Sequence, residues 1–197
     1  MYALDSGGTM VTNPGAAEGV RGGQNREGWC TGLLDFSPSN TDNTNILFLI
    51  DSRFCKFAAY NGNSAAIYRC PADQSTVRIG GAVHPRVRSI SANNWMRGKV
   101  WWDNVGEGFV MYIKTADITS PSKMWVFIDE REDSINDGSF AVSMNGYPSQ
   151  PSAYKLVDYP ASYHNGACGF SFADGHAEVH KWVDPRTMPM LKKGQDL

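Results

Sequence analysis

The segment that most constrains the fold is residues 167–182, which read ACGFSFADGHAEVHKW. Asp174-Gly175 lies between two runs in which apolar and polar side chains alternate, and this arrangement is typical of a β-hairpin with a two-residue type I′ turn. Alternation places every second side chain on the same face of a strand. The pattern therefore predicts a C-terminal hairpin over about 167–182, with one face turned to a core.

The predicted turn also assigns the faces of the hairpin. With two residues in the turn, Phe172 faces Ala177, and the opposite face carries polar residues: Ser171, His176, Glu178 and His180. Two imidazoles and a carboxylate at alternate positions could bind a transition metal through His176, Glu178 and His180, with His164 joining if its loop folds back. A solvated polar strand face explains the same pattern, so both interpretations stay open.

The rest of the chain predicts an α+β fold in which strands predominate. Apolar residues make up 42% of the 197 residues and charged residues only 19%, which is enough for a buried core but unlike a helical bundle. Apolar residues recur at helical spacing from Leu47 to Phe57, so one main helix is expected over about 45–60. The nearly continuous apolar run 123–129 predicts a central strand buried on both faces.

Local composition assigns the remaining segments. Shorter apolar or alternating runs predict strands over 65–70, 86–92, 99–102, 109–113 and 139–144. Residues 1–45 are rich in Gly, Asn, Thr and Ser and are expected to form an extended, loop-rich region over the surface, and the tail 183–197 is expected to be loose. One domain over 1–197, built on an antiparallel sheet, is the simplest organisation.

Charge and hydropathy exclude two broad classes. Eighteen basic residues against 20 acidic residues give a net charge of −2, without the basic stripe that a phosphate-binding surface needs, so no nucleic-acid partner is expected. No segment approaches the roughly 20 apolar residues needed to cross a bilayer. The N-terminus also lacks the basic and apolar regions of a signal peptide.

The four cysteines, Cys30, Cys55, Cys70 and Cys168, contain no CxxC pair, which argues against a clustered zinc knuckle. In an oxidising compartment, a helix-to-strand return would favour a Cys55–Cys70 disulfide. Four buried and inert thiols are the alternative.

The segment 129–138 packs five carboxylates and one asparagine into ten residues. Hard oxygen ligands in a flexible loop suit Ca²⁺, so Asp133, Asn136 and Asp137 are candidate Ca²⁺ ligands. The spacing does not match an EF-hand loop. An ordinary acidic turn, in which Arg131 neutralises its neighbours, explains the same composition.

Paired carboxylates are also the catalytic groups of most glycoside hydrolases. Glu130 closes the predicted central strand, while Asp174 and Glu178 lie in the hairpin, so these three are the candidate acids of a small hydrolase. The nucleophile elbow, the phosphate-binding loop and the dinucleotide fingerprint are absent from the sequence, which leaves other enzyme classes with less support.

Five landmarks occur in a fixed order along the chain. His164 is followed by nine residues and then Asp174-Gly175, and the preceding landmarks are MYALDSGG at 1–8, YRCPAD at 68–73, RVRSISANNWM at 86–96 and FIDEREDSINDGSF at 127–140. Together they resemble the H-X9-DG prepilin-like proteins, a pseudopilin-related family expanded in planctomycete and verrucomicrobial bacteria. The resemblance covers nearly the whole chain, and its motif residues are His164, Asp174 and Gly175.

The resemblance implies the globular head of a pilin- or pseudopilin-like subunit, in which an antiparallel sheet packs on a stalk helix. Such a head would be periplasmic or exposed at the cell surface, and its partners would be other pilin subunits or the secretion machinery. Family members begin with a prepilin leader and a long apolar helix, and MYALDSGG matches the end of that helix. Met1 is therefore expected to be an internal methionine, and membrane attachment would be only through the stalk.

Two further expectations come from the same resemblance. Some type II secretion pseudopilins carry a structural Ca²⁺ in a C-terminal loop, which adds weight to Ca²⁺ as a cofactor at the acidic segment. Gly175 is expected to supply the positive φ angle of the hairpin turn, with Asp174 capping backbone amides or binding metal. The resemblance favours a structural or interaction role, and the small hydrolase is the alternative.

Overall fold

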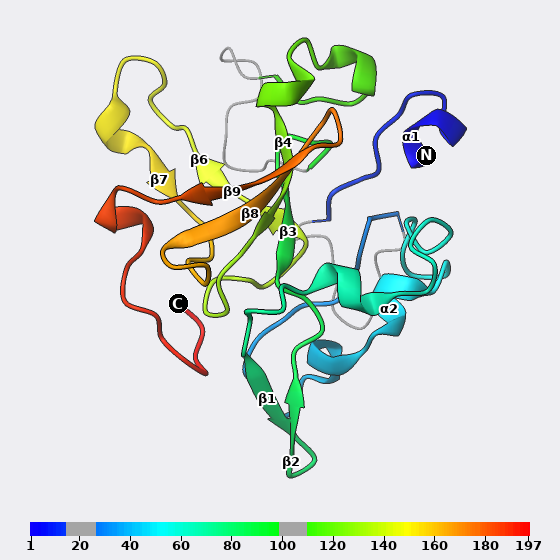
Figure 1. The fold of residues 1–197 in the computed structure, drawn as a ribbon, viewed down its shortest axis with the longest axis vertical. Helices are drawn as coiled ribbons and strands as arrows, with labels where there is room; N and C mark the ends of the chain where they lie inside the picture. The colour runs from blue at the N-terminus through cyan, green and yellow to red at the C-terminus, as the bar shows by residue number, and fades with distance from the viewer. Residues whose placement is uncertain (15–26, 99–109) are drawn as a thin grey trace.

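The structure is a computed structural model, and it describes residues 1–14, 27–98 and 110–197 (Figure 1). Its centre is a five-stranded sheet in the order β5-β3-β4-β8-β9. These strands are Ser139–Phe140 (β5), Ile90–Asn93 (β3), Trp125–Asp129 (β4), Ala167–Phe172 (β8) and Ala177–Lys181 (β9). The predicted strand-rich α+β fold is confirmed, although the sheet is mixed because β3 and β5 run parallel while the other neighbours are antiparallel.

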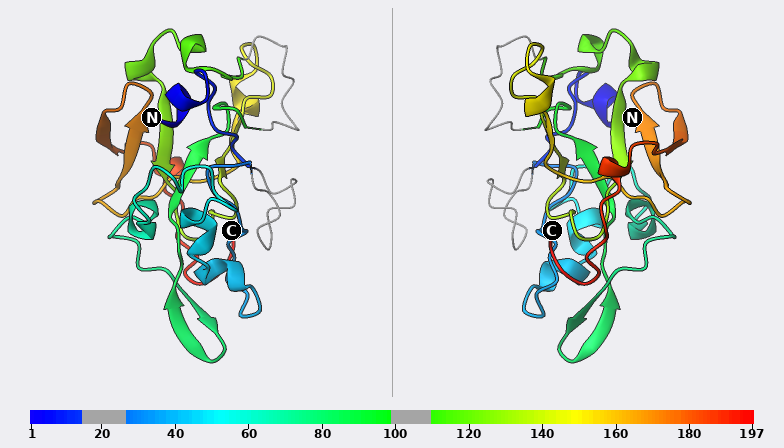
Figure 2. Two further views of the ribbon diagram at one scale, coloured as in Figure 1. Left: turned by 90° about the vertical axis from the view of Figure 1, so that its right-hand side faces the viewer. Right: turned by 90° about the vertical axis from the view of Figure 1, so that its left-hand side faces the viewer.

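Two small two-stranded sheets extend from the central one. Thr76–Ile79 (β1) and Ala82–Pro85 (β2) form a hairpin that projects from the body of the molecule (Figure 2). Val142–Ser143 (β6) pairs with Lys155–Leu156 (β7). The single strand expected over 139–144 is therefore divided between β5 in the central sheet and β6 in the small one.

Helical structure is short throughout the described part of the chain. The α-helices are Tyr2–Asp5 (α1) and Leu47–Ile50 (α2), and the 3₁₀ turns are Thr41–Thr44 (η3), Ala65–Tyr68 (η4), Thr115–Asp117 (η5), Pro121–Lys123 (η6), Pro151–Ala153 (η7) and Pro185–Thr187 (η8). None of the described helices has the length and apolar character that crossing a membrane requires.

The prediction of one main helix over 45–60 is wrong beyond Ile50, where α2 ends. Asp51 follows α2 in an extended conformation, and its carboxylate accepts the Arg53 N–H at 2.9 Å. Side chains that bond nearby backbone amides in this way compete with helix propagation, so the chain continues as turns to Asn63. The strand expected over 65–70 is likewise replaced by η4, and the segment 99–109 lies outside the described residues.

The predicted hairpin is present as β8 and β9, but its register differs by one residue. Ser171 pairs with Ala177, and the Phe172 N–H donates to the His176 carbonyl at 2.9 Å. The loop thus holds three residues, with Gly175 in the left-handed region at φ +94°, which is a common alternative to the two-residue turn. The expected pairing of Phe172 with Ala177 is wrong, and Phe172 shares a face with His176.

The two faces of the sheet carry different cores. Ala92 and Phe127 lie in the core around Trp29, while Ile128, Phe140 and Cys168 form a second core on the other side. Trp29 is fully buried, and its ring meets that of Phe127 edge to face at 5.0 Å. The loop-rich region at 1–45 therefore supplies the centre of a core, whereas the sequence suggested a surface covering.

The C-terminal tail is tied down, in contrast to the loose tail expected over 183–197. Arg131 donates to the carbonyls of Pro189 and Met190 at 2.7 and 3.1 Å. The Leu197 N–H donates to the Asp133 carbonyl at 2.6 Å. These bonds hold the end of the chain against the acidic segment after β4.

Candidate functional site

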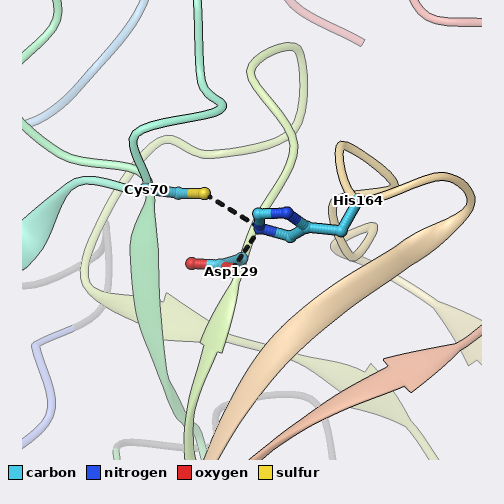
Figure 3. A group of neighbouring side chains, drawn as sticks. All are labelled: Cys70, Asp129 and His164. Carbon is cyan, nitrogen blue, oxygen red and sulfur yellow. Dashed lines mark hydrogen bonds and ion pairs between the residues drawn. The ribbon is translucent and has the colours of Figure 1, made fainter.

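Three residues from distant parts of the chain meet beside the central sheet: Cys70, Asp129 and His164 (Figure 3). The Cys70 Sγ lies 3.2 Å from the His164 Nε2, and an Asp129 carboxylate oxygen lies 4.0 Å from the same nitrogen. The sulfur, nitrogen and oxygen atoms all lie within 4.8 Å of one another. Within 1–14, 27–98 and 110–197, no other three His, Cys, Asp or Glu side chains converge in this way.

Hydrogen bonds with backbone N–H groups hold Cys70 and Asp129 in position. Cys70 follows η4, and its N–H donates to the Ser89 Oγ at 2.8 Å. Asp129 ends β4, and its carboxylate accepts the Gly169 N–H of β8 at 3.0 Å. A Cβ at residue 169 would lie 2.9 Å from that carboxylate, so this approach requires glycine.

His164 lies in the turn that leads into β8. Its N–H donates to the Ala167 carbonyl at 3.2 Å, and Asn165 and Gly166 both adopt positive φ angles within that turn. The imidazole is thereby directed toward the end of β4. Its side chain is 39% exposed, against 15% for the side chain of Asp129, so the cluster is open to solvent on the histidine side.

The electrostatics and geometry of the cluster disfavour a catalytic thiolate. Burial raises the pKa of the Cys70 thiol above its ordinary value, and the neighbouring Asp129 carboxylate raises it further. Burial also raises the pKa of Asp129, with the Gly169 N–H and His164 acting in the opposite sense. In a catalytic triad the acid orients the ring nitrogen that does not face the nucleophile, whereas here Cys70 and Asp129 approach the same nitrogen.

The hairpin residues His176, Glu178 and His180 share one face, as predicted, and Glu178 Oε1 lies 4.0 Å from His180 Nδ1, but the three ligand atoms do not all lie within 4.8 Å of one another. The shift in register brings the phenylalanines to the same face, where the ring of Phe172 stacks on His176 at 4.3 Å. The ring of Phe170 contacts that of His180 edge to face, with the ring centroids 5.9 Å apart. The predicted transition-metal site on this face is therefore not assembled, and His164 lies in the separate cluster.

The proposed Ca²⁺ ligands of the acidic segment are engaged within the protein. Both carboxylate oxygens of Asp133 accept from the Arg131 guanidinium. Asp137 accepts the Ser139 N–H at 2.7 Å, while the Asn136 side-chain oxygen accepts the Asp137 N–H at 2.5 Å. In this structure these oxygens serve turns and an ion pair, and Ca²⁺ binding by Asp133, Asn136 and Asp137 stays a prediction.

The three candidate acids of a hydrolase lie in different environments, one buried and two at the exposed hairpin. Glu130 is 1% exposed, and burial together with the nearby Asp158 raises its pKa well above the ordinary range. Glu178 is exposed on the hairpin, and Asp174 bonds His176, its oxygen lying 2.6 Å from the Nδ1. A carboxyl group as deeply buried as that of Glu130 has no access to a sugar substrate, so Glu130 is excluded as one of the candidate acids.

The cysteines are all free and buried, so the expected Cys55–Cys70 disulfide is wrong. The Cys55 thiol instead donates to the Trp29 carbonyl at 2.7 Å, and Cys70 contacts His164. Burial raises the pKa of Cys30 to about 12. Thiols held in this protonated form react slowly with oxidants.

A large apolar groove lies over the central sheet, from β3 across β4 to β8 and β9, and has a volume of about 1000 Å³. The N-terminal segment Met1–Ala3 lines one part of it, and Phe127, Ala177 and Val179 line another. Val179 is 66% exposed, and all of β9 is exposed. Sequence patterning missed this groove because the register expected for the hairpin placed Ala177 and Val179 with the buried phenylalanines.

The motif residues of the family resemblance have separate roles in the structure. Gly175 supplies the positive φ of the hairpin loop as expected, and Asp174 accepts the His176 N–H at 3.1 Å in that loop. His164 belongs to the Cys70–Asp129 cluster. Comparison with known proteins adds no relative: no family model matches the chain, and no curated protein and no solved structure matches it significantly.

Proposed function

We propose that this chain is the globular head of a pilin- or pseudopilin-like subunit, which acts by interaction in secretion or filament assembly in the periplasm or at the cell surface. The observation that carries the proposal is the apolar groove bounded by the N-terminal segment and the open face of the hairpin. A soluble domain rarely leaves an apolar surface of this size uncovered unless a partner or another segment occupies it.

The occupant that fits best is a helix that precedes Tyr2 in the same polypeptide. Helix α1 begins at Tyr2 and lies at the rim of the groove, so a helix continuing backward from it would start beside the sheet. A groove of about 1000 Å³ matches roughly two turns of a helix about 10 Å across. Packing one apolar helix face on a sheet is a standard way to complete a two-layer α+β domain.

The other features of the chain agree with an extracytoplasmic interaction role. The five sequence landmarks in order support the pilin-like assignment. Glu130 is buried and does not line the groove, so it cannot pair with Glu178 there as the hydrolase alternative expected.

The experiment compares one substitution in two lengths of chain. The segment that precedes Met1 in the source gene is read first, and residues 1–197 are then expressed with and without it. Val179→Asp is expected to lower the unfolding temperature of the longer chain by several degrees, because a charge would be buried under the helix, and to change that of residues 1–197 little. Val183→Asp is the control, since Val183 is 93% exposed outside the groove.

Two results would contradict the proposal. One is an in-frame stop codon directly upstream of Met1 without an apolar helix between them. The other is an equal effect of Val179→Asp in both lengths of chain, which would mean that the preceding segment does not cover the groove.

A further inference from the structure

The cluster of Cys70, Asp129 and His164 presents three different ligand atoms to one point. Its sulfur-to-nitrogen distance is 3.2 Å and its oxygen-to-nitrogen distance is 4.0 Å. Around a tetrahedral zinc ion, bond lengths of about 2.3 Å to sulfur and 2.0–2.1 Å to nitrogen and oxygen place neighbouring ligand atoms roughly 3.3–3.6 Å apart. The sulfur-to-nitrogen distance would have to lengthen by about 0.4 Å and the oxygen-to-nitrogen distance to shorten by about 0.6 Å, while the sulfur and oxygen already lie within 4.8 Å of each other.

We propose that Cys70 Sγ, Asp129 Oδ2 and His164 Nε2 bind a single divalent transition-metal ion, with Zn²⁺ as the best match. A thiolate is a soft ligand that Ca²⁺ and Mg²⁺ do not select, while imidazole and thiolate together suit zinc. This ligand set shares only Asp129 with the acidic segment 129–138 and includes neither Asp133 and Asp137 nor the hairpin histidines.

The surroundings supply the support that a metal site needs. The Gly169 N–H bonds the Asp129 carboxylate, and the Ser89 hydroxyl accepts the Cys70 N–H, so two of the ligands are already held in place. Outer contacts of this kind orient ligands and contribute to metal affinity. The exposed side of His164 leaves room for water at the fourth coordination position.

The ion would cross-link three segments that are separate in sequence. Cys70 follows η4, Asp129 ends β4, and His164 precedes β8, so one ion would fix the entry to the hairpin against the centre of the sheet. Asp129 also lines the groove, but binding of the ion by these three side chains does not require an occupant there, so this proposal can be tested separately from the pilin-like function.

The test measures zinc and cobalt binding to residues 1–197 in metal-free reducing buffer. One Zn²⁺ per chain is expected, with an affinity that falls by at least about tenfold in His164→Ala and Asp129→Asn. With Co²⁺ as the probe, we expect a thiolate-to-metal charge-transfer absorption and visible bands of tetrahedral cobalt. Cys70→Ser should lose the charge-transfer absorption.

The controls separate ligand loss from misfolding and from other sites. His180→Ala and Cys55→Ser remove a histidine and a cysteine outside the cluster and are expected to keep the full stoichiometry and the cobalt spectrum. Near-ultraviolet circular dichroism checks that each variant is folded, and His164 is exposed enough for its alanine variant to fold.

The proposal is overturned if the wild-type chain binds no zinc, if the three cluster variants bind it unchanged, or if His180→Ala abolishes binding. A plain Cys70–His164 hydrogen bond would then account for the contact.

Discussion

At the level of single residues, the buried carboxyl groups determine how the fold responds to pH. Glu130 accepts the Ser134 hydroxyl at 2.8 Å and lies near Asp158, whose own pKa burial raises to about 7. Because both pKa values are raised in the folded state, folding binds protons that the unfolded chain releases. Their contribution to stability is therefore present below about pH 4 and is lost as the pH rises through the raised pKa values, of which that of Asp158 is about 7.

Glu130→Gln is expected to flatten this pH dependence, because the amide keeps the shape of the side chain but cannot ionise. The variant should be more stable than the wild type by about 1–3 kcal/mol at pH 8 and should lose that advantage near pH 4, measured by urea unfolding at both pH values. Glu178→Gln, at an exposed acid of the hairpin, serves as the control and should leave the dependence unchanged. An equal stability difference for Glu130→Gln at the two pH values would show that ionisation of Glu130 does not set the dependence.

The sequence singled out Cys70, Asp129 and His164 individually, but it assigned each of them to other partners. Cys70 suggested a disulfide, Asp129 belonged to the acidic segment, and His164 was a motif residue that could join the hairpin histidines. Their convergence depends on the pairing of β4 with β8 and on the chain path after η4. Local spacing does not encode that path, so the cluster could not be predicted from a single sequence.

At the level of elements, the hairpin shows how far local signals reach. Asp174-Gly175 predicted the position of the turn, because glycine at a positive φ is needed there. The loop length remained ambiguous between two and three residues, and a shift of one residue exchanges the faces of a strand. That single ambiguity moved Phe172 onto the imidazole face and Val179 into the groove.

The tail is the element whose attachment is easiest to test. The side chains of Arg131 and Asp133 are only 4% and 0% exposed, and Asp133 accepts the Lys192 N–H at 2.8 Å. Lysine cannot reproduce the forked contacts of arginine with a carboxylate and two carbonyls. Arg131→Lys is therefore expected to lower the free energy of unfolding by about 1–3 kcal/mol and to speed tryptic cleavage at Lys192 and Lys193.

The matched control is the ion pair between Arg186 and Asp184, which has the same forked geometry on the surface. The Arg186 side chain is 89% exposed, so Arg186→Lys should change stability by less than about 0.5 kcal/mol. Trypsin cleaves after lysine and arginine alike, so both variants keep their sites. Unchanged cleavage in Arg131→Lys would mean that the other tail contacts suffice to hold it.

At the level of the whole molecule, composition and strand patterning predicted the α+β class, and the buried run before Asp129 predicted the central strand. Only Ile128 of β4 is fully buried, however, because the face with Phe127 opens into the groove. Whether a sheet face is covered depends on segments that pack on it from elsewhere. The alternation within a strand does not specify those segments, which is why the open face emerged only in three dimensions.

The open groove makes a prediction for residues 1–197 alone. An environment-sensitive apolar dye, anilinonaphthalene sulfonate, should bind the native protein and fluoresce, because the groove offers about 1000 Å³ of largely apolar space. Val179→Asp should reduce the fluorescence severalfold while changing stability by no more than about 1 kcal/mol, since Val179 is 66% exposed. Val183→Asp, which removes an exposed valine outside the groove, should leave the fluorescence unchanged. Equal losses in both variants would indicate binding to scattered surface residues, and the groove would then not be the apolar surface that this fold leaves open.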